Sequence, residues 1–215
     1  GLFAAFTPCA VLNLGGIANL SLLGADGQVL GFDTGPANCL LDAWSERHLQ
    51  QPCDMGGAWA ASGRIDDALL TDLLQDPYFA APTPKSSGRE YFNLGWLQSR
   101  LDRHRVPAVD VQATLLALTA RSVARALHDT KVAVSRVLVC GGGVHNPILM
   151  QALAQAMAPI AVSSTASCGV DPDFIEATLF AWLAQERLAL RAGNLPAVTG
   201  ARGARVLGAV HAGHA

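Results

Sequence analysis

The stretch that decides the fold runs from Cys9 to Phe32 and reads CAVLNLGGIANLSLLGADGQVLGF. It holds three apolar segments, which are separated by the pair Gly15–Gly16 and by the turn signal Asp26–Gly27. Connections as short as these join strands that run antiparallel, and Asp-Gly between apolar runs is typical of a hairpin. The stretch therefore predicts a three-stranded antiparallel meander.

Beyond these strands, helices and strands alternate. Apolar spacing predicts helices over 36–49, 109–129, 147–157 and 171–190, and strands over 137–140 and 159–164. Between residues 50 and 109 the pattern changes: a short helix signal over 65–74 is followed by a loop-like stretch, and we expect an insertion on the surface or beside a cleft. The order predicts an α/β fold with a mixed sheet and helices packed on its faces. At 215 residues the chain forms one large domain or at most two small ones.

Four positions carry signals for the start of a helix. The dipeptides Asn146–Pro147 and Asp171–Pro172 each combine an N-cap residue with a proline in the first turn. Asp110 is a candidate cap for the helix over 109–129, and Pro36 suits the first turn of the helix that follows the meander.

Composition disfavours several classes of protein. The net charge is −2 without a run of Lys or Arg, which is unlike a nucleic-acid-binding groove. No apolar segment reaches the roughly 18 residues that cross a bilayer, and the opening lacks the charged start of a secretory signal. The five cysteines include no C-x-x-C pair, and the six histidines lack ligand spacing. We expect a cytoplasmic protein with reduced thiols and no zinc.

Three joints end a strand in glycines or an acid just before a helix or a turn. They are NLGG at 13–16, FDTGPAN at 32–38 and VCGGGVHNP at 139–147. Glycine lets a ligand approach the backbone, and helix N-termini favour anions, although one such joint alone often needs glycine only for geometry. Three joints together favour a phosphate site at Asn13, Gly15, Gly16, Asp33, Thr34, Gly35, Gly141, Gly142, Gly143 and Asn146.

Two acidic residues each leave two interpretations open. Asp33, expected at the end of a strand, could hold Mg²⁺ directly or through water, or it could cap the following helix. Glu176 lies early on a helix that is apolar nearly all round. A carboxylate there is costly unless it faces a polar cleft, so we favour a cleft over an interaction with the helix dipole.

Two known nucleotide signatures are missing. The sequence has no G-x-x-x-x-G-K-[ST] loop, and the segment GGGVHN at 141–146 has Asn146 where the dinucleotide fingerprint needs its third glycine. A nicotinamide-dependent enzyme is therefore disfavoured. The remaining interpretation is a nucleotide held between several loops.

Seven blocks stand out: NLGGIANLSLL, FDTGPAN, DMGGAWAASG, PKSSGREYFN, VCGGGVHNP, GVDPDFIEATLFAWLA and NLPAVTGA. In this order they resemble the C-terminal half of the anhydro-N-acetylmuramic acid kinase family. The resemblance implies an actin-like, Hsp70 and sugar-kinase (ribonuclease H-like) ATPase fold, with residues 1–215 as the nucleotide-binding lobe of a two-lobe kinase. It further implies a homodimer that uses ATP and Mg²⁺ to open 1,6-anhydro-N-acetylmuramic acid, yielding N-acetylmuramic acid 6-phosphate in peptidoglycan recycling.

The resemblance also implies roles for individual residues. FDTGPAN resembles the second phosphate loop, with Asp33 near the metal and Gly35 near the β- and γ-phosphates. The glycines 141–143 resemble the adenosine loop, and Asn146 caps the helix behind it. Glu176 matches a position that contacts the sugar, and Asn38 is the second expected substrate contact.

Parts of the family pattern are absent. The first phosphate loop and the aspartate that activates water would lie before Gly1, and Ser87 stands where the family usually has Thr. No catalytic base is therefore assigned within residues 1–215, and we expect these residues alone to bind nucleotide weakly without turnover. The alternative from another class is a non-catalytic, kinase-like nucleotide-binding or sensor module.

Overall fold

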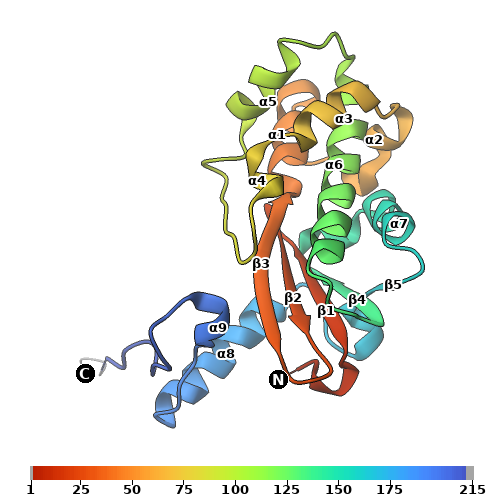
Figure 1. The fold of residues 1–215 in the computed structure, drawn as a ribbon. Helices are drawn as coiled ribbons and strands as arrows, with labels where there is room; N and C mark the ends of the chain where they lie inside the picture. Colours follow the sequence, from red (N-terminus) through yellow and green to blue (C-terminus); the bar gives the residue numbers. More distant parts are fainter. Residues whose placement is uncertain (1, 212–215) are drawn as a thin grey trace.

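The computed structural model describes residues 2–211, and its centre is a five-stranded sheet (Figure 1). The strands follow the order β3-β2-β1-β4-β5 across the sheet. Antiparallel pairing joins β1 (Cys9–Leu14), β2 (Ile17–Leu23) and β3 (Val29–Pro36), whereas β4 (Arg136–Cys140) and β5 (Ala161–Ser164) continue the sheet parallel to β1. This arrangement confirms the predicted α/β fold with a mixed sheet.

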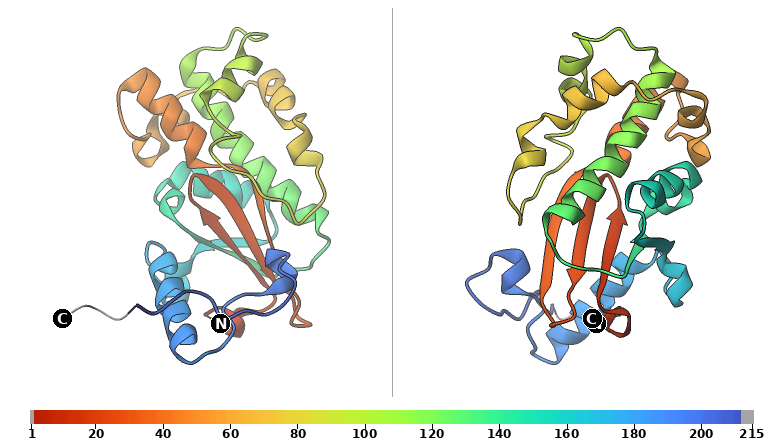
Figure 2. Two further views of the ribbon diagram at one scale, coloured as in Figure 1. Left: turned by 90° about the vertical axis from the view of Figure 1, so that its left-hand side faces the viewer. Right: turned by 45° about the vertical axis from the view of Figure 1, so that its right-hand side comes forward.

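The helices gather on both sides of this sheet. They are α1 (Asn38–Leu49), α2 (Ala58–Ser62), α3 (Asp67–Leu74), α4 (Pro77–Ala80), α5 (Leu94–Leu101), α6 (Ala108–Asp129), α7 (Pro147–Ala156), α8 (Ile175–Leu188) and α9 (Pro196–Thr199). Figure 2 shows α6 and α8 on opposite sides of the sheet. Helices α1 to α5 form a cluster with the outer part of α6, beyond one end of the antiparallel strands (Figure 1).

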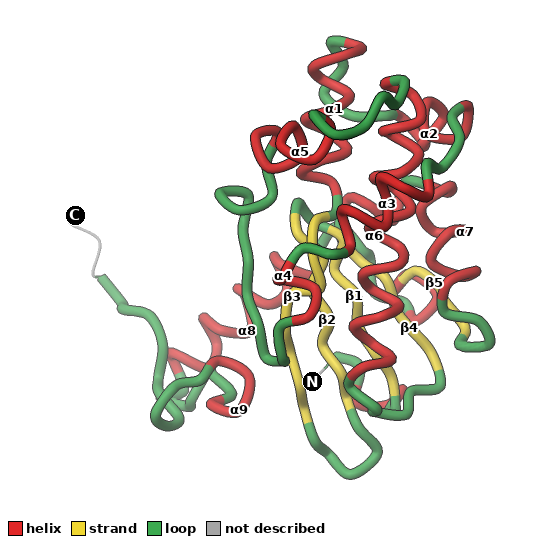
Figure 3. Tube along the Cα trace, turned by 45° about the horizontal axis from the view of Figure 1, so that its top comes forward, coloured by secondary structure: helices red, strands yellow, loops and turns green. Residues whose placement is uncertain are grey.

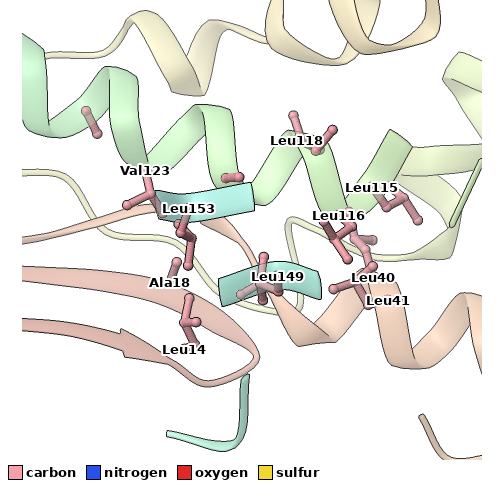
Figure 4. Packing of buried hydrophobic residues seen from close by; sticks show 14 of the residues in the cluster. Leu14, Ala18, Leu40, Leu41, Leu115, Leu116, Leu118, Val123, Leu149 and Leu153 are labelled. Atoms are coloured by element: carbon pink, nitrogen blue, oxygen red, sulfur yellow. The ribbon is translucent and has the colours of Figure 1, made fainter. Parts of the chain in front are cut away.

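One face of the sheet, here called the core face, carries the main hydrophobic core. Alternate residues of β1 and β2, such as Leu12, Leu14 and Leu20, are fully buried because successive side chains of a strand point to opposite faces. They pack with α6, α1 and α7, and the close view in Figure 4 shows leucines of α7 beside Leu14 and Ala18, and leucines of α1 gathered with those of α6. The core face is therefore closed by three helices.

The opposite face, here called the second face, is covered less completely. Val11 and Ser21 are half-buried there and line an apolar cavity of about 670 Å³ with the side chains of α8. Several large side chains of α8 are exposed, among them Phe180 at 70%. The apolar pattern of this helix therefore does not reflect full burial in the described part of the chain.

The structure confirms one of the predicted helix starts and corrects three. Asn146 caps α7, accepting the N–H of Leu149 at 3.0 Å. Pro36 instead ends β3, because it still pairs with β2. Asp110 lies inside the first turn of α6 and binds the N–H of Arg64, and Asp171 lies four residues before α8. Contacts with distant residues decide the positions of Pro36 and Asp110, whereas Asp171 binds the nearby N–H of Asp173.

Residues 50–107 confirm the short helix signal over 65–74, where α3 lies, but the rest of the segment is less loop-like than we expected. They contain α2 to α5, and buried Leu69, Leu73 and Phe92 belong to the same core as the sheet. Asp76, only 3% exposed, accepts hydrogen bonds from Tyr91, Trp96, Arg100 and the N–H of Tyr78. The segment is therefore a packed part of the domain.

The search for membrane helices covered residues 2–211. None of their helices has both the length and the apolarity that crossing a bilayer demands.

Candidate functional site

A row of polar side chains crosses the second face of the sheet. Asp33 is paired in register with Asn19, Asn19 with Asn13, and Asn13 with Cys140. Residues directly opposite one another on neighbouring strands share a face, so these four side chains lie side by side. We call Asp33, Asn19, Asn13 and Cys140 the polar row.

Two glycine turns flank the polar row at the same edge of the sheet. The Gly15–Gly16 turn joins β1 to β2 just beyond the pair of Asn13 and Asn19. Gly141 follows β4 with φ 80°, and a Cβ there would collide with Oδ1 of Asn13. A Cβ at Gly143 would lie 2.6 Å from Cβ of Leu14. Glycine is thus required where the turn after β4 touches β1.

Gly142 differs from its two neighbours. A Cβ there would meet only Nδ2 of Asn38, at 3.9 Å, so its surface is open. The same Nδ2 donates to the carbonyl of Leu14 at 3.0 Å. Asn38 thereby joins the start of α1 to the end of β1 and lies beside the turn after β4.

Asp33 lies inside β3 and binds a loop. Its Oδ1 accepts Nδ2 of Asn19 at 2.8 Å, and its Oδ2 accepts the hydroxyl of Ser86 at 3.0 Å and the N–H of Ser87 at 2.9 Å. No side chain caps α1. The helix-cap interpretation of Asp33 is therefore wrong, because the carboxylate is used to hold the loop between α4 and α5 against the sheet.

Thr34 and Gly35 do not join the polar row. Thr34 is 1% exposed and donates to the carbonyl of Ala18 at 3.3 Å. Gly35 is buried, and a Cβ there would lie 2.7 Å from Cε1 of Phe79 and 3.3 Å from the hydroxyl of Ser122. Both residues pack inside the protein, so this structure lends no support to the phosphate contacts expected of them.

The start of α1 is also less available to an anion than the sequence suggested. The N–H groups of Ala37 and Cys39 donate to the carbonyl of Gly16 at 3.0 Å, and that of Asn38 donates to Gly15 at 3.1 Å. The first orphan N–H groups of the helix are thereby satisfied internally. The Gly15–Gly16 turn caps α1, and the two form one unit.

Glu176 lies at the other end of the polar row. It is exposed in the first turn of α8, so the burial argument from the sequence does not apply. Burial and, to a smaller extent, the negative charge of Glu176 together raise the pKa of the Cys140 thiol to about 11. The Cys140 thiol therefore stays protonated at neutral pH and is not a nucleophile, while Glu176 lies near enough to influence it.

Two residues of the site were missed from the sequence. Asn19 was not singled out because it lies within an apolar strand. Its alternation with the buried residues of β2 nevertheless places its side chain on the face opposite the core. Arg89 was quoted only as part of the block PKSSGRE, yet its guanidinium lies against Gly16. No local sequence pattern could have indicated this contact, because 73 residues separate Arg89 from Gly16.

The DMGG turn, residues 54–57, packs against the start of α7. A Cβ at Gly57 would collide with Oδ1 of Asn146. Asp54 fixes the turn by accepting the N–H groups of Trp59 and Ala60, each at 2.9 Å. The turn before α7 is therefore supported from outside by a second glycine turn.

The oxygen and nitrogen ligands available in the polar row suit a metal ion that arrives bound to a ligand better than one held by the protein alone. Within residues 2–211, no three His, Cys, Asp or Glu side chains gather to hold an ion. Mg²⁺ often uses one or two carboxylates together with phosphates and waters. An ionised carboxylate offers about four acceptor positions, and Asp33 fills three, which leaves one for a water of a hydrated Mg²⁺.

Comparisons with known proteins match nearly all of the chain. The family model described as "Anhydro-N-acetylmuramic acid kinase" covers residues 2–213. A protein of that name from Xanthomonas oryzae pv. oryzae is 59% identical over 202 residues, which are 94% of this chain and 54% of the relative. One from Chromohalobacter salexigens is 54% identical over 210 residues, covering 94% of this chain and 56% of the relative. The chain thus spans about half the length of the curated relatives it matches.

A solved structure is similar at a much lower level. It is the activator of the 2-hydroxyisocaproyl-CoA dehydratase from Clostridium difficile with bound ADPNP, at 16% identity and a TM-score of 0.38. The match covers 78% of this chain and 56% of that chain. A similarity of this size carries no argument about the site.

Proposed function

Because this chain belongs to the anhydro-N-acetylmuramic acid kinase family, we propose that the whole protein is an ATP-dependent kinase of 1,6-anhydro-N-acetylmuramic acid. Water adds to the anomeric carbon of the sugar while the bond from that carbon to O6 breaks. O6 takes the γ-phosphoryl group of ATP, and ADP leaves. The product is N-acetylmuramic acid 6-phosphate, and a role in peptidoglycan recycling belongs to the same proposal.

The observation that carries this proposal is the position of the polar row between two glycine turns. Both turns follow the carboxyl ends of parallel strands, β1 and β4. Ligands of open α/β sheets bind in the crevice outside the carboxyl ends of the strands. Backbone approach at Gly142 and donors at Asn13 and Asn19 suit a polyphosphate there.

We divide the ligand between the two turns. The turn over 141–143, with Asn146 behind it, takes the adenosine side, and Asn13 with Gly15–Gly16 takes the phosphates. ATP, when bound, supplies the phosphoryl group, and Mg²⁺ neutralises charge on its phosphates, with Asp33 reaching this ion through water. Glu176 and Asn38 are the proposed sugar contacts, while the buried Thr34 and Gly35 have no place in this assignment.

The base that activates water is not assigned to this chain. Cys140 is excluded from that role because its raised pKa keeps the thiol neutral. We propose that the base lies in the half of the relatives' length that this chain does not span. A cytoplasmic homodimer, with neither nucleic acid nor membrane as a partner, completes the proposal.

The decisive experiment follows the product of the whole protein in water labelled with heavy oxygen. We expect ADP to form in step with the sugar phosphate, with the label at the anomeric hydroxyl and the phosphate on O6. Nucleotide binding without any sugar phosphate would instead support a non-catalytic nucleotide-binding module. Label in released inorganic phosphate alone would indicate an ATPase and contradict the kinase.

A further inference from the structure

Arg89 lies directly on the Gly15–Gly16 turn. A Cβ at Gly16 would be 2.7 Å from Nε of Arg89, 3.0 Å from Nη2 and 3.2 Å from Cζ. The guanidinium therefore covers the space that a side chain at position 16 would fill. No such contact exists at Gly15, where a Cβ would meet nothing closer than 3.7 Å.

The positive charge of Arg89 has no close partner in the described part of the chain. The side chain is exposed, and no carboxylate of residues 2–211 lies within 4.0 Å of it. Burial raises the pKa of Asp42 on α1, and the charge of Arg89 acts against this rise. Arg89 thus lies near a carboxylate without forming an ion pair with it.

The loop that carries Arg89 is fixed to the sheet. Asp33 binds Ser86 and Ser87 through its carboxylate and donates its own N–H to the carbonyl of Lys85 at 2.9 Å. Lys85 in turn donates to the carbonyls of Tyr78 and Phe79. Figure 3 shows this loop running alongside β3. The hydrogen bonds of this loop therefore hold Arg89 beside the Gly15–Gly16 turn.

A second unpaired group lies in the same loop. The hydroxyl of Ser87 is buried and has no hydrogen-bond partner among the described residues. Buried polar atoms normally have one. This unpaired hydroxyl lies two residues from the unpaired guanidinium, in the same loop.

We infer that Arg89 binds an oxyanion of the ligand beside the Gly15–Gly16 turn, and that Asp33 is the positioning residue for the loop that presents it. The inference rests on the proposed function and extends it to a residue outside the three glycine joints. A guanidinium offers paired N–H donors that match phosphate or carboxylate geometry. Such a cation also stabilises the charge that develops in phosphoryl transfer. The absence of a side chain at Gly16 lets the guanidinium of Arg89 approach the turn.

The test measures how fast phenylglyoxal modifies Arg89 in the whole protein, by peptide mass spectrometry. We expect ATP or pyrophosphate to slow this modification about tenfold or more, as charge-assisted hydrogen bonds of this kind would, and adenosine to have no effect. Arg105, exposed and without an ion pair among residues 2–211, is the internal control and should react at an unchanged rate.

The ligands separate the two sources of an oxyanion. Protection by pyrophosphate identifies a phosphate of the nucleotide. Protection by N-acetylmuramic acid but not by N-acetylglucosamine identifies the carboxylate of the sugar. Protection by pyrophosphate but not by ATP supports the oxyanion site and contradicts the nucleotide part of the proposed function. If none of these ligands protects Arg89, the inference is overturned, whatever the kinase assay gives.

Substitutions in the turn supply a matched pair. Gly16→Ala places a methyl group where the guanidinium lies and should displace it, so that ATP affinity falls about tenfold or more, as in Arg89→Ala. Gly15→Ala adds the same methyl group to the same turn with free space around it and should cause a smaller loss. Equal losses in the two alanine variants, with unchanged affinity in Arg89→Ala, would contradict the role of Arg89.

Discussion

The carboxylate of Asp33 holds Asn19 with one oxygen and the loop residues Ser86 and Ser87 with the other. Asparagine has almost the same shape, but its NH₂ group cannot accept a hydrogen bond. Asp33→Asn therefore removes both a charge near the proposed phosphates and an anchor of the loop that carries Arg89. The charge and the loop anchor predict different effects of Mg²⁺ on how strongly the Asp33→Asn variant binds nucleotide.

We expect Asp33→Asn to weaken nucleotide binding mainly when Mg²⁺ is present, because only then does the carboxylate contribute through a bound water. Calorimetric titration with ATP, with and without Mg²⁺, measures this. Asp26→Asn, in the exposed turn between β2 and β3, is the matched control. The same loss in both conditions would restrict Asp33 to anchoring the loop.

At the same scale, Asp76 connects the segments from α3 to α5. Burial alone would raise its pKa, but hydrogen bonds from Trp96, Tyr78 and Tyr91 and the charge of Arg100 together lower it. Asp76→Asn should destabilise the protein by about 3–5 kcal/mol, because it leaves partly buried donors without an acceptor. Urea unfolding measures this loss. Asp129→Asn, in an exposed ion pair with Arg125, should change stability by less than about 0.5 kcal/mol.

The pH dependence of stability provides a second readout for Asp76. Its pKa is lower in the folded state than the ordinary value of 3.8. The stabilisation is therefore complete above that ordinary value, and it is lost as the pH falls through the folded-state pKa. Unfolding curves recorded at decreasing pH should show a shallower acid decline for Asp76→Asn than for the wild type. Parallel declines would exclude Asp76 as a source of the acid sensitivity.

At the scale of elements, the N-terminus of α7 is capped by a side chain and lies in the proposed site. Asn146 caps this helix and contacts the DMGG turn. Asn146→Ala should reduce stability by about 1 kcal/mol and weaken adenosine binding, since the turn before α7 loses its support. Thermal unfolding and titration with adenosine measure the two effects. Asn146→Ser, which keeps a capping oxygen, should recover most of the stability.

The sequence predicted the elements whose signals are local. Short glycine connections made the antiparallel strands predictable, and the Asn146–Pro147 pair located the start of α7. Asp110 and Asp171 looked like caps, but Asp110 accepts the N–H of the distant Arg64, and Asp171 accepts the N–H of Asp173 in a turn before α8. The N–H of Gly141 binds the carbonyl of the next residue, Pro172, from a distant part of the chain. Such bonds depend on the fold and leave no local pattern.

The candidate site was predictable only in part, for the same reason. The glycines around the polar row were found because strand ends rich in glycine are visible in a sequence. The burial of Gly35 under Phe79 and the arrival of Arg89 at Gly16 were not, since each contact joins residues far apart in the chain. Asn19 could have been found from the alternation of β2 alone.

At the scale of the whole molecule, α8 leaves a large apolar surface open. Phe174, Phe180 and Leu188 are 62%, 70% and 74% exposed. Large exposed apolar side chains favour association where they gather in a patch. We expect residues 1–215, produced alone, to self-associate with rising concentration, and Phe180→Ser to reduce the association.

Sedimentation velocity at several concentrations measures this self-association. Met55→Ser, which removes a side chain that is 76% exposed on the short DMGG turn, is the comparison. We expect it to leave the association unchanged, because Met55 is not part of α8. Equal behaviour of the two variants would contradict a role for the α8 surface.

The bonds between the Gly15–Gly16 turn and α1 have a mechanical consequence. Three N–H groups tie the first turn of α1 to two carbonyls, so a ligand that displaces the turn also tilts the helix. One helical turn further on, the indole of Trp44 donates to the carbonyl of Ala108 at 2.8 Å and thereby touches the start of α6. Tilting α1 would strain or break that bond. Because Trp59, Trp96 and Trp182 also emit, we expect a variant that keeps Trp44 as its only tryptophan to report ligand arrival at the turn through its emission spectrum.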